Sequence, residues 1–175
     1  MKTFKYILRL TLTLFLITAV VAGLLGFVDY LTAGKIQALQ EEKAKASMME
    51  VLPAENYEEI AAEKEGIVTA YKADDLGYVV RVKTGGFGGD IDMMVGIDAE
   101  GKLTGISIIS HAETASLGAN CTREDWRSQF VGLSGTLAVD KDGGEIDALT
   151  GATVTSRAVT KGINLALEFV EEVGK

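Results

Sequence analysis

The residues with the clearest chemical potential lie in the segment 147–156, which carries four hydroxyl side chains and one glycine. An amphipathic pattern over residues 155–173 predicts a helix at its end. Unpaired backbone N–H groups and the helix dipole make such an N-terminus attractive to a negative group such as phosphate. Gly151 would let the backbone approach a ligand closely or adopt a left-handed conformation. The segment is therefore a candidate phosphate site; the alternative is that Thr155 or Ser156 caps the helix and the other threonines are turn residues.

The composition limits the chemistry that the other residues can supply. The single cysteine, Cys121, excludes an intrachain disulfide framework and a cysteine-held zinc or iron–sulfur centre, and we expect it to be buried. The single histidine, His111, excludes multi-histidine metal sites and disfavours a Ser-His-Asp hydrolase, so a structural role is expected. The net charge of −8 argues against nucleic acid, because a phosphate backbone demands clustered Lys and Arg. Any redox chemistry must therefore come from a cofactor, and no metal site is expected.

An uncharged apolar stretch over residues 10–28 indicates a membrane anchor. Its nineteen residues, at roughly 1.5 Å each, cover about 28 Å, close to the hydrocarbon thickness of a bilayer. Lys2, Lys5 and Arg9 precede it, and basic residues favour the cytoplasmic side. We therefore expect a single pass through the cell membrane, with the N-terminus cytoplasmic and the C-terminal domain extracytoplasmic. The alternative is a cleaved signal peptide, because residues 20–22 loosely resemble a cleavage site.

The chain beyond the anchor is acidic. All 25 acidic residues but only 14 of the 17 basic residues follow Val28, which leaves a net charge of −11 there. Anionic headgroups repel such a domain, so it is not expected to lie flat on the membrane. The alternative is that this charge serves solubility alone.

Residues 36–52 are expected to continue the anchor as a helical stalk. Ala, Gln, Glu and Lys are abundant there, and apolar residues recur at near-helical spacing. Pro53 ends the pattern, because the residue before a proline is pushed out of the α region. A second helical stretch is expected over residues 56–64. The chain thus divides into a cytoplasmic N-terminus with the transmembrane anchor (1–34), a helical stalk (35–64) and a C-terminal domain (65–175).

Four segments of the C-terminal domain have the composition of β-strands. They are rich in Val, Ile, Thr and Tyr and are separated by turns that contain Gly or Asp: residues 67–73, 78–84, 91–98 and 103–110. The strands are expected to be antiparallel neighbours, because the turns are short and a parallel crossover needs a dozen or more residues. The glycine-rich turn 85–89 lacks the Lys-Ser/Thr of a P-loop, so nucleotide hydrolysis is not supported.

Helices are expected to follow the sheet. A short one has Thr122 as its N-cap, with Trp126 and Phe130 four residues apart on one face. Residues 137–139 suggest one more strand, and the helix over 155–173 follows. The fold class is therefore α+β: a single N-terminal transmembrane helix followed by a mostly antiparallel sheet with flanking helices.

The phosphate interpretation becomes more specific when the whole motif is considered. The string Asp-x-x-Thr-Gly-Ala-Thr over residues 147–153 resembles the site at which a flavin transferase attaches FMN, through its phosphate, to the last threonine. The resemblance implies that Thr153 carries FMN by a phosphoester. It also implies that Thr150, Gly151 and Ala152 shape the acceptor turn and that Asp147 belongs to the transferase recognition signal.

Two further segments resemble the same covalent FMN-binding family. The turn over residues 85–91 is similar to its glycine-rich turn, and residues 111–118 are similar to its Glu-Thr-Pro-Gly-Leu-Gly loop near the flavin. The resemblance implies flavin contacts from this loop: Glu113, Thr114, Leu117 and Gly118. Ala115 and Ser116 replace the usual Pro-Gly. Since proline fixes φ and glycine permits φ > 0, the loop is expected to differ in shape or rigidity.

Together with the anchor, these motifs resemble the G-subunit family of the Rnf ion-translocating electron-transport complex. That family implies a flavoprotein electron relay in a membrane ferredoxin:NAD oxidoreductase, which is a redox subunit of a translocase and not catalytic alone. Its partners would be the other membrane and iron–sulfur subunits of the complex, with a flavin transferase for maturation. Two alternatives stay open: the C subunit of a sodium-pumping NADH:quinone reductase, and an anchored scaffold module without active flavin.

Overall fold

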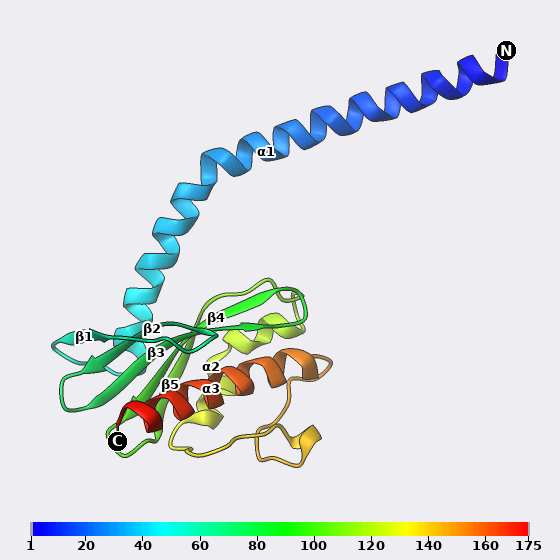
Figure 1. Cartoon of the computed structure of the whole chain (residues 1–175). Helices are drawn as coiled ribbons and strands as arrows, with labels where there is room; N and C mark the ends of the chain where they lie inside the picture. The colour runs from blue at the N-terminus through cyan, green and yellow to red at the C-terminus, as the bar shows by residue number, and fades with distance from the viewer. Residues whose placement is uncertain (1, 175) are drawn as a thin grey trace. The chain divides into compact units, whose positions relative to one another are not determined.

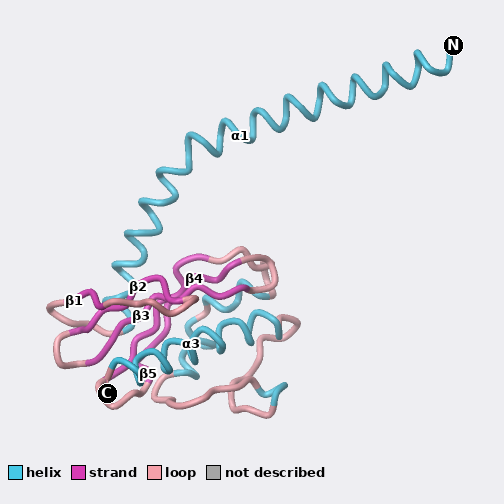
Figure 2. Tube along the Cα trace, viewed as in Figure 1, coloured by secondary structure: helices cyan, strands magenta, loops and turns pink. Residues whose placement is uncertain are grey.

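The computed structural model describes residues 2–174, and the chain divides into two compact units, Met1–Glu41 and Glu42–Lys175. Figure 1 labels the α-helices and strands along the chain, and Figure 2 colours the same trace by secondary structure. The full order of the elements follows, in which η denotes a short 3-10 helix. They are α1 (Lys2–Val51), β1 (Tyr57–Ile60), β2 (Ile67–Ala73), β3 (Gly77–Gly85), β4 (Asp90–Asp98), β5 (Leu103–Ser110), η1 (Gly118–Thr122), α2 (Glu124–Arg127), η2 (Ser128–Phe130), η3 (Asp140–Asp142) and α3 (Thr153–Val173).

The first element, α1, is one continuous helix of 50 residues. It is long and apolar enough to cross a membrane. Apolar side chains in its N-terminal half, such as Leu14 and Phe27, are exposed, as expected of side chains that face lipid. The helix expected over residues 36–52 is confirmed as the C-terminal part of α1. It ends at Val51, two residues before Pro53, as the restriction on the residue before proline requires.

A five-stranded antiparallel sheet, with strand order β1-β2-β3-β4-β5, forms the centre of the second unit. The four expected strands are confirmed. The helix expected over residues 56–64 is wrong, because Tyr57–Ile60 form the edge strand β1 and pair with β2. The Tyr57 hydroxyl also donates a hydrogen bond to Leu52 O (2.7 Å), which joins the start of β1 to the end of α1. The weak helical pattern of this segment is overridden by pairing with a neighbouring strand.

Both faces of the central strand β4 are covered. Met93 packs in the main core with Ile163 of α3, whereas its neighbour Met94 packs in a second cluster with Val51 at the end of α1. Successive side chains of a strand point to opposite faces, so the second unit has three layers: the end of α1, the sheet, and α3. This double burial explains why residues 91–97 are almost continuously apolar.

The end of α1 packs on the sheet over two glycines that are paired across neighbouring strands, Gly96 on β4 and Gly105 on β5. A Cβ atom at Gly96 would lie 2.6 Å from Val51 O and would also collide with Thr104 Oγ1. The Thr104 hydroxyl donates to the same Val51 O at 2.5 Å. The backbone of α1 therefore rests directly on the sheet, at a place where β4 has no side chain.

Gly96→Ala is expected to destabilise the protein by about 2 kcal/mol, because the added methyl forces α1 and β5 apart. Gly105→Ala is the matched control: its Cβ would meet Val51 Cα at 3.6 Å, an ordinary contact. Thermal unfolding of the full-length chain in detergent checks both variants. Equal melting temperatures for the two variants would show that α1 does not pack closely against the sheet at Gly96.

Two local expectations for the segment after β5 are wrong. Thr122 does not cap α2; it ends η1, and its hydroxyl donates back to Ala119 O (2.9 Å). Residues 137–139 form no strand: Val139 makes one isolated bridge with Ile146. The reason is that the Asn164 amide takes both backbone groups of Leu137, accepting from its N–H (2.9 Å) and donating to its O (2.8 Å).

The expected apolar face of α2 and η2 is confirmed. Trp126 and Phe130 are both buried, and their rings meet edge to face at 5.3 Å between centroids. This pair fixes the short helical segment against the core.

Candidate functional site

A hollow of about 430 Å³ lies at the start of α3. Three segments that are far apart in the sequence line it: the glycine-rich turn after β3, the loop after β5, and the turn into α3. The lining residues are Phe87, Glu113, Thr114, Leu117, Gly118, Gly151, Ala152, Thr153, Val154 and Thr155. Seven of the eight residues named from the motifs as cofactor-binding therefore meet in one place. Thr150 does not line this hollow; it is exposed and lines a neighbouring one.

Thr153 is the first residue of α3, two residues earlier than the periodicity alone predicted. The helix has Ala152 as its N-cap and receives no side-chain capping bond from the described residues. Ser156 instead donates to Ala152 O (3.1 Å) and accepts from Leu149 N (2.9 Å). The simple capping alternative is therefore wrong. The first N–H groups of α3 are available to a negative group beside the Thr153 hydroxyl.

Glu113 joins the three segments of the hollow. Its Oε1 accepts the backbone N–H groups of Phe87 (2.7 Å) and Gly88 (3.1 Å). Its Oε2 accepts the hydroxyl of Thr155 (2.7 Å), a residue that the motif did not single out. The glycine-rich turn thus encloses a carboxylate of its own chain.

Glu113 is a buried residue, with 8% of its surface exposed. Burial raises its pKa, but the hydrogen bonds from Thr155, Gly88 and Phe87 outweigh burial, so the pKa lies below its ordinary value. Glu113 is therefore a fixed negative charge at the back of the hollow at neutral pH.

Gly118 is required by the bond between Glu113 and Thr155. A Cβ atom there would lie 2.5 Å from Glu113 Oε2 and 2.6 Å from Thr155 Oγ1. Any side chain at this position would break the carboxylate–hydroxyl contact. The glycine of the loop motif therefore serves packing inside the site.

Ser116 stands where the related loops carry glycine, and it keeps a left-handed conformation with φ of +62°. Such a φ is uncommon for residues with a side chain. The Asn120 amide donates to Ser116 O (3.1 Å) and helps to hold this turn. The loop therefore retains a glycine-like turn at Ser116 despite the loss of the Pro-Gly pair.

Comparison with known proteins assigns the chain to a family. Residues 1–51 match the family described as the RnfG N-terminal region, and residues 86–168 match the FMN-binding domain. The chain is 37% identical to the G subunit of the Na⁺-translocating ferredoxin:NAD⁺ oxidoreductase complex of Acetobacterium woodii, over 98% of this chain and 95% of that relative. The chain belongs to the G-subunit family of Rnf complexes.

Other members of the G-subunit family are similar over most of their length. The G subunit of the ion-translocating oxidoreductase complex of Methanosarcina acetivorans is 33% identical, with 97% of each chain covered. The G subunit of the proton-translocating ferredoxin:NAD⁺ oxidoreductase complex of Clostridium ljungdahlii is 32% identical, with 88% of this chain and 86% of that relative covered.

A solved structure shares the fold of this G-subunit family member. It is the C subunit of the Na⁺-translocating NADH-quinone reductase from Parabacteroides distasonis, with a TM-score of 0.59 over 82% of this chain and 96% of that chain. The sequence identity is 15%, so the likeness extends to the fold alone. The family matches identify the chain with the G subunits, and the C-subunit alternative is set aside. The match of residues 86–168 supports FMN as the cofactor, and the apolar helix of the RnfG N-terminal region supports a membrane anchor.

His111 and Cys121, the single histidine and the single cysteine of this G-subunit family member, both have structural roles. His111 Nδ1 accepts the backbone N–H of Glu113 at 3.2 Å, so the imidazole supports the turn that presents the carboxylate. Cys121 is fully buried in the main core. Burial, with a smaller effect of the Glu113 charge, raises the pKa of the Cys121 thiol to about 11.

Cys121 is therefore expected to resist alkylation in the folded protein, because only the thiolate is nucleophilic. At pH 8 its reaction with iodoacetamide should be at least about 100-fold slower than that of a free thiol with a pKa near 8.5. Intact-mass measurement over time checks the rate, with the denatured chain as the control. Rapid labelling of the folded protein would contradict the burial of this side chain.

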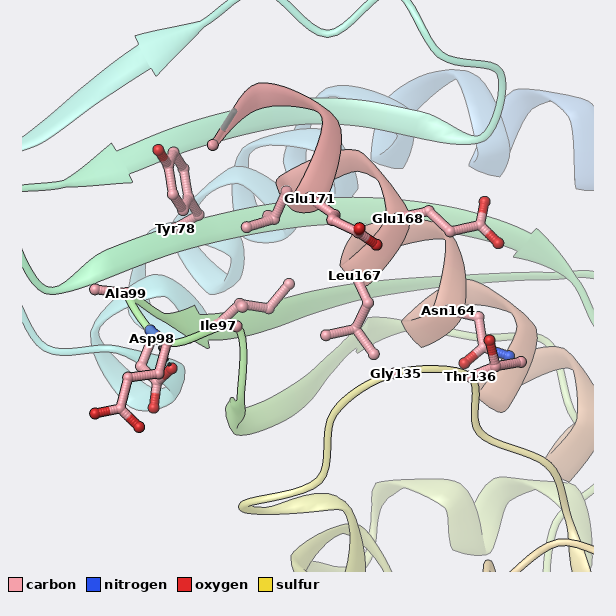
Figure 3. Close-up of a pocket in the computed structure, with 14 residues that line it drawn as sticks. Tyr78, Ile97, Asp98, Ala99, Gly135, Thr136, Asn164, Leu167, Glu168 and Glu171 are labelled. Carbon is pink, nitrogen blue, oxygen red and sulfur yellow. Dashed lines mark hydrogen bonds between the residues drawn. The ribbon is translucent and has the colours of Figure 1, made fainter.

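A second hollow, of about 410 Å³, lies beside the C-terminal half of α3 (Figure 3). Its lining includes Glu168, Glu171 and Asn164, but no residue named from the motifs. The Asn164 amide is already engaged with the backbone of Leu137. Among residues 2–174, no group of His, Cys, Asp and Glu side chains is placed to hold a metal ion.

Proposed function

We propose that this chain is the FMN-carrying electron-relay subunit of a membrane ferredoxin:NAD oxidoreductase that couples electron transfer to ion translocation, with FMN joined by a phosphoester to Thr153. The observation that carries the proposal is the position of Thr153. It is the first residue of an uncapped helix, in a hollow built by the FMN-binding segment 86–168.

The residues of the hollow fit the two ends of FMN. The open N–H groups of α3 and the helix dipole stabilise a phosphate on the Thr153 hydroxyl. Phe87, Leu117 and Val154 present apolar surface to a ring, and all three are more than 40% exposed. A volume of about 430 Å³ lies within the range of about 300–1,000 Å³ for small-molecule sites. When bound, FMN supplies a group that accepts two electrons and passes them on singly.

Attachment requires an activated flavin donor and a transferase. Thr153 Oγ would lose its proton and supply the oxygen of the new bond to the flavin phosphorus. The bond between that phosphorus and the leaving group of the activated donor would break. The side chain of Asp147 is exposed beside this segment, as recognition by a transferase requires.

The partners we propose are the other membrane and iron–sulfur subunits of an Rnf complex. The names of the relatives differ in the coupling ion, which is Na⁺ for Acetobacterium woodii and the proton for Clostridium ljungdahlii. Residues 10–28 of this chain carry no ionisable side chain. Because ion paths through membranes are marked by such side chains, we infer that other subunits provide the path.

The mass of one tryptic peptide tests the attachment. Cleavage after Lys141 and Arg157 releases residues 142–157, which contain Thr153. In protein produced together with a flavin transferase, this peptide should carry the mass of one esterified FMN, and fragmentation should place it on Thr153. The denatured protein should also remain yellow after acid precipitation. A peptide of unmodified mass would contradict the proposed attachment.

The orientation that we propose places the C-terminal domain outside the cytoplasm, because Lys2, Lys5 and Arg9 precede the anchor. A bound cofactor that cannot diffuse away is advantageous there, since lost FMN is not easily replaced. Alkaline phosphatase fused to the C-terminus is expected to be active in intact cells, because that enzyme matures only after export. Fluorescence of a cytoplasm-only reporter at the same position would reverse the assignment.

A further inference from the structure

The segment that leads into Thr153 is held by side chains from outside the FMN motif. We call residues 147–152 the acceptor segment. Its last two residues, Gly151 and Ala152, form one wall of the FMN hollow. Its first four residues, from Asp147 to Thr150, line the neighbouring polar hollow together with Trp126 and Gln129. The acceptor segment thus separates two neighbouring hollows. A shift of this segment would therefore change the shape of the FMN hollow.

The backbone of Asp147 is fixed on both sides. Its N–H donates to Gln129 Oε1 (2.8 Å), and its O accepts the indole N–H of Trp126 (2.7 Å). The Gln129 amide also donates to the backbone carbonyl of Trp126 at 2.8 Å, which fixes the Gln129 side chain against its own helical segment. The side chain of Asp147 itself stays exposed.

The helical segment that carries Trp126 and Gln129, α2 with η2, is itself fixed in place. Trp126 is 9% exposed as a residue, and its ring packs on that of Phe130. The neighbouring Arg127 donates to Ile106 O (2.5 Å) and pairs with Glu50 (3.0 Å) near the end of α1. These contacts tie α2 to the sheet and to α1, so Trp126 and Gln129 can act as rigid supports.

The next two amides are also bonded. Ala148 N–H donates to Asp140 Oδ1 (3.1 Å), and Leu149 N–H donates to Ser156 Oγ (2.9 Å). At the other end of the segment, a Cβ atom at Gly151 would lie 3.2 Å from Leu117 Cδ2. The wall therefore touches the loop that carries Glu113. Ser156 also donates to Ala152 O (3.1 Å), so the wall is anchored to α3 at one end of the acceptor segment and, through Asp147, to Trp126 and Gln129 at the other. Loss of the hold on Asp147 would leave the wall with the α3 anchor alone and let it move away from Leu117.

We infer that Trp126 and Gln129 are positioning residues for the flavin: by holding Asp147 they keep the Gly151–Ala152 wall closed on the ring. The inference rests on the proposed attachment of FMN to Thr153. Neither residue is needed for the attachment bond, because Thr153 belongs to α3, which is packed independently by Ser156 and Val159. Loss of the two supports should therefore loosen the bound flavin without reducing its amount.

Two variants remove the hydrogen bonds: Trp126→Phe keeps an aromatic ring but is smaller, and Gln129→Met keeps the length of the side chain. Both are tested singly and together in the full-length, flavinylated chain. Arg123→Gln is the matched control, because Arg123 lines the same polar hollow but pairs with Asp125. The measurements are peptide mass for covalent FMN, hydrogen exchange of the Asp147–Leu149 amides, flavin fluorescence anisotropy, and the midpoint potential.

With covalent FMN equal to that of the parent, we expect exchange of these amides to be about fivefold faster in each single variant and roughly 30-fold faster in the double variant, because one or both of the bonds that hold Asp147 are lost. Anisotropy should fall, and the midpoint potential should rise, because water reaching the ring stabilises the negative charge gained on reduction. The Arg123→Gln control should match the parent. If Trp126→Phe does not fold, Gln129→Met alone decides.

Two outcomes overturn the inference in distinguishable ways. FMN present at the parental level, with parental exchange, anisotropy and potential, overturns the positioning role and leaves the proposed function intact. Absence of FMN from Thr153 of the parent chain overturns the proposed function and this inference together.

Discussion

Thr153→Ala is expected to remove all covalent flavin from the protein while leaving the fold intact. In the proposed attachment, Thr153 at the first position of α3 supplies the acceptor oxygen. Its side chain lines the hollow and not the core, and alanine is favourable in a helix, so stability should change by less than about 1 kcal/mol. Flavin fluorescence on a denaturing gel, beside the melting temperature of the same sample, measures both effects.

Thr153→Ser is the matched control for this result. It keeps a hydroxyl at the same place, so partial covalent flavin is expected. A fluorescent band of normal strength in the alanine variant would move the attachment to another residue. An unfolded alanine variant would instead show that Thr153 contributes to stability in a way that its contacts do not indicate.

Glu113→Ala is expected to destabilise the protein by about 3 kcal/mol, because it leaves the N–H groups of Phe87 and Gly88 and the Thr155 hydroxyl without their acceptor. A chain of this length should then melt roughly 10 °C lower. The FMN hollow should also lose its shape, since the three segments meet at this carboxylate. Thermal unfolding in detergent measures the change, and a melting temperature within about 2 °C of the parent would show that Glu113 does not join the segments.

The same carboxylate gives the stability a definite pH dependence. Its pKa in the folded protein lies below the ordinary value of 4.5, so its contribution is fully present above about pH 4.5. The contribution is lost as the pH falls through the lowered pKa, because the protonated acid is a weaker acceptor. Glu113→Gln removes the titration but keeps the size of the side chain. Below pH 4.5 the stability of this variant should therefore fall less steeply than that of the parent.

Local patterns predicted most of the architecture. The uncharged stretch of α1 and the four alternating or continuously apolar strands follow from periodicity, and short turns with glycine require antiparallel neighbours. The errors lie where a distant residue decides the local structure. Tyr57–Ile60 become a strand because β2 offers its edge, and Leu137 is kept out of a sheet by the Asn164 amide. Such partners leave no trace in the segment's own pattern.

In the candidate site too, local motifs were predictable from the sequence, whereas contacts between distant residues were not. Its candidate cofactor-binding residues were predicted from motifs along the chain, and the structure brings all of them except Thr150 to one hollow. The role of Thr155 was missed because its partner Glu113 is 42 residues away. A polar residue on the buried face of an amphipathic helix was the one available signal, since such a group requires a hydrogen-bond partner.

The order of the strands determines when, during synthesis, the pocket around Glu113 and Thr153 can form. Because the strands are neighbours in the order in which they are made, β1 to β5 can assemble one after another as the chain emerges. The last element, α3, supplies both Thr153 and the hydroxyl that Glu113 accepts. The pocket is therefore completed only when α3 has been made and has packed on the sheet, and a chain that stops before α3 would lack both Thr153 and the hydroxyl partner of Glu113.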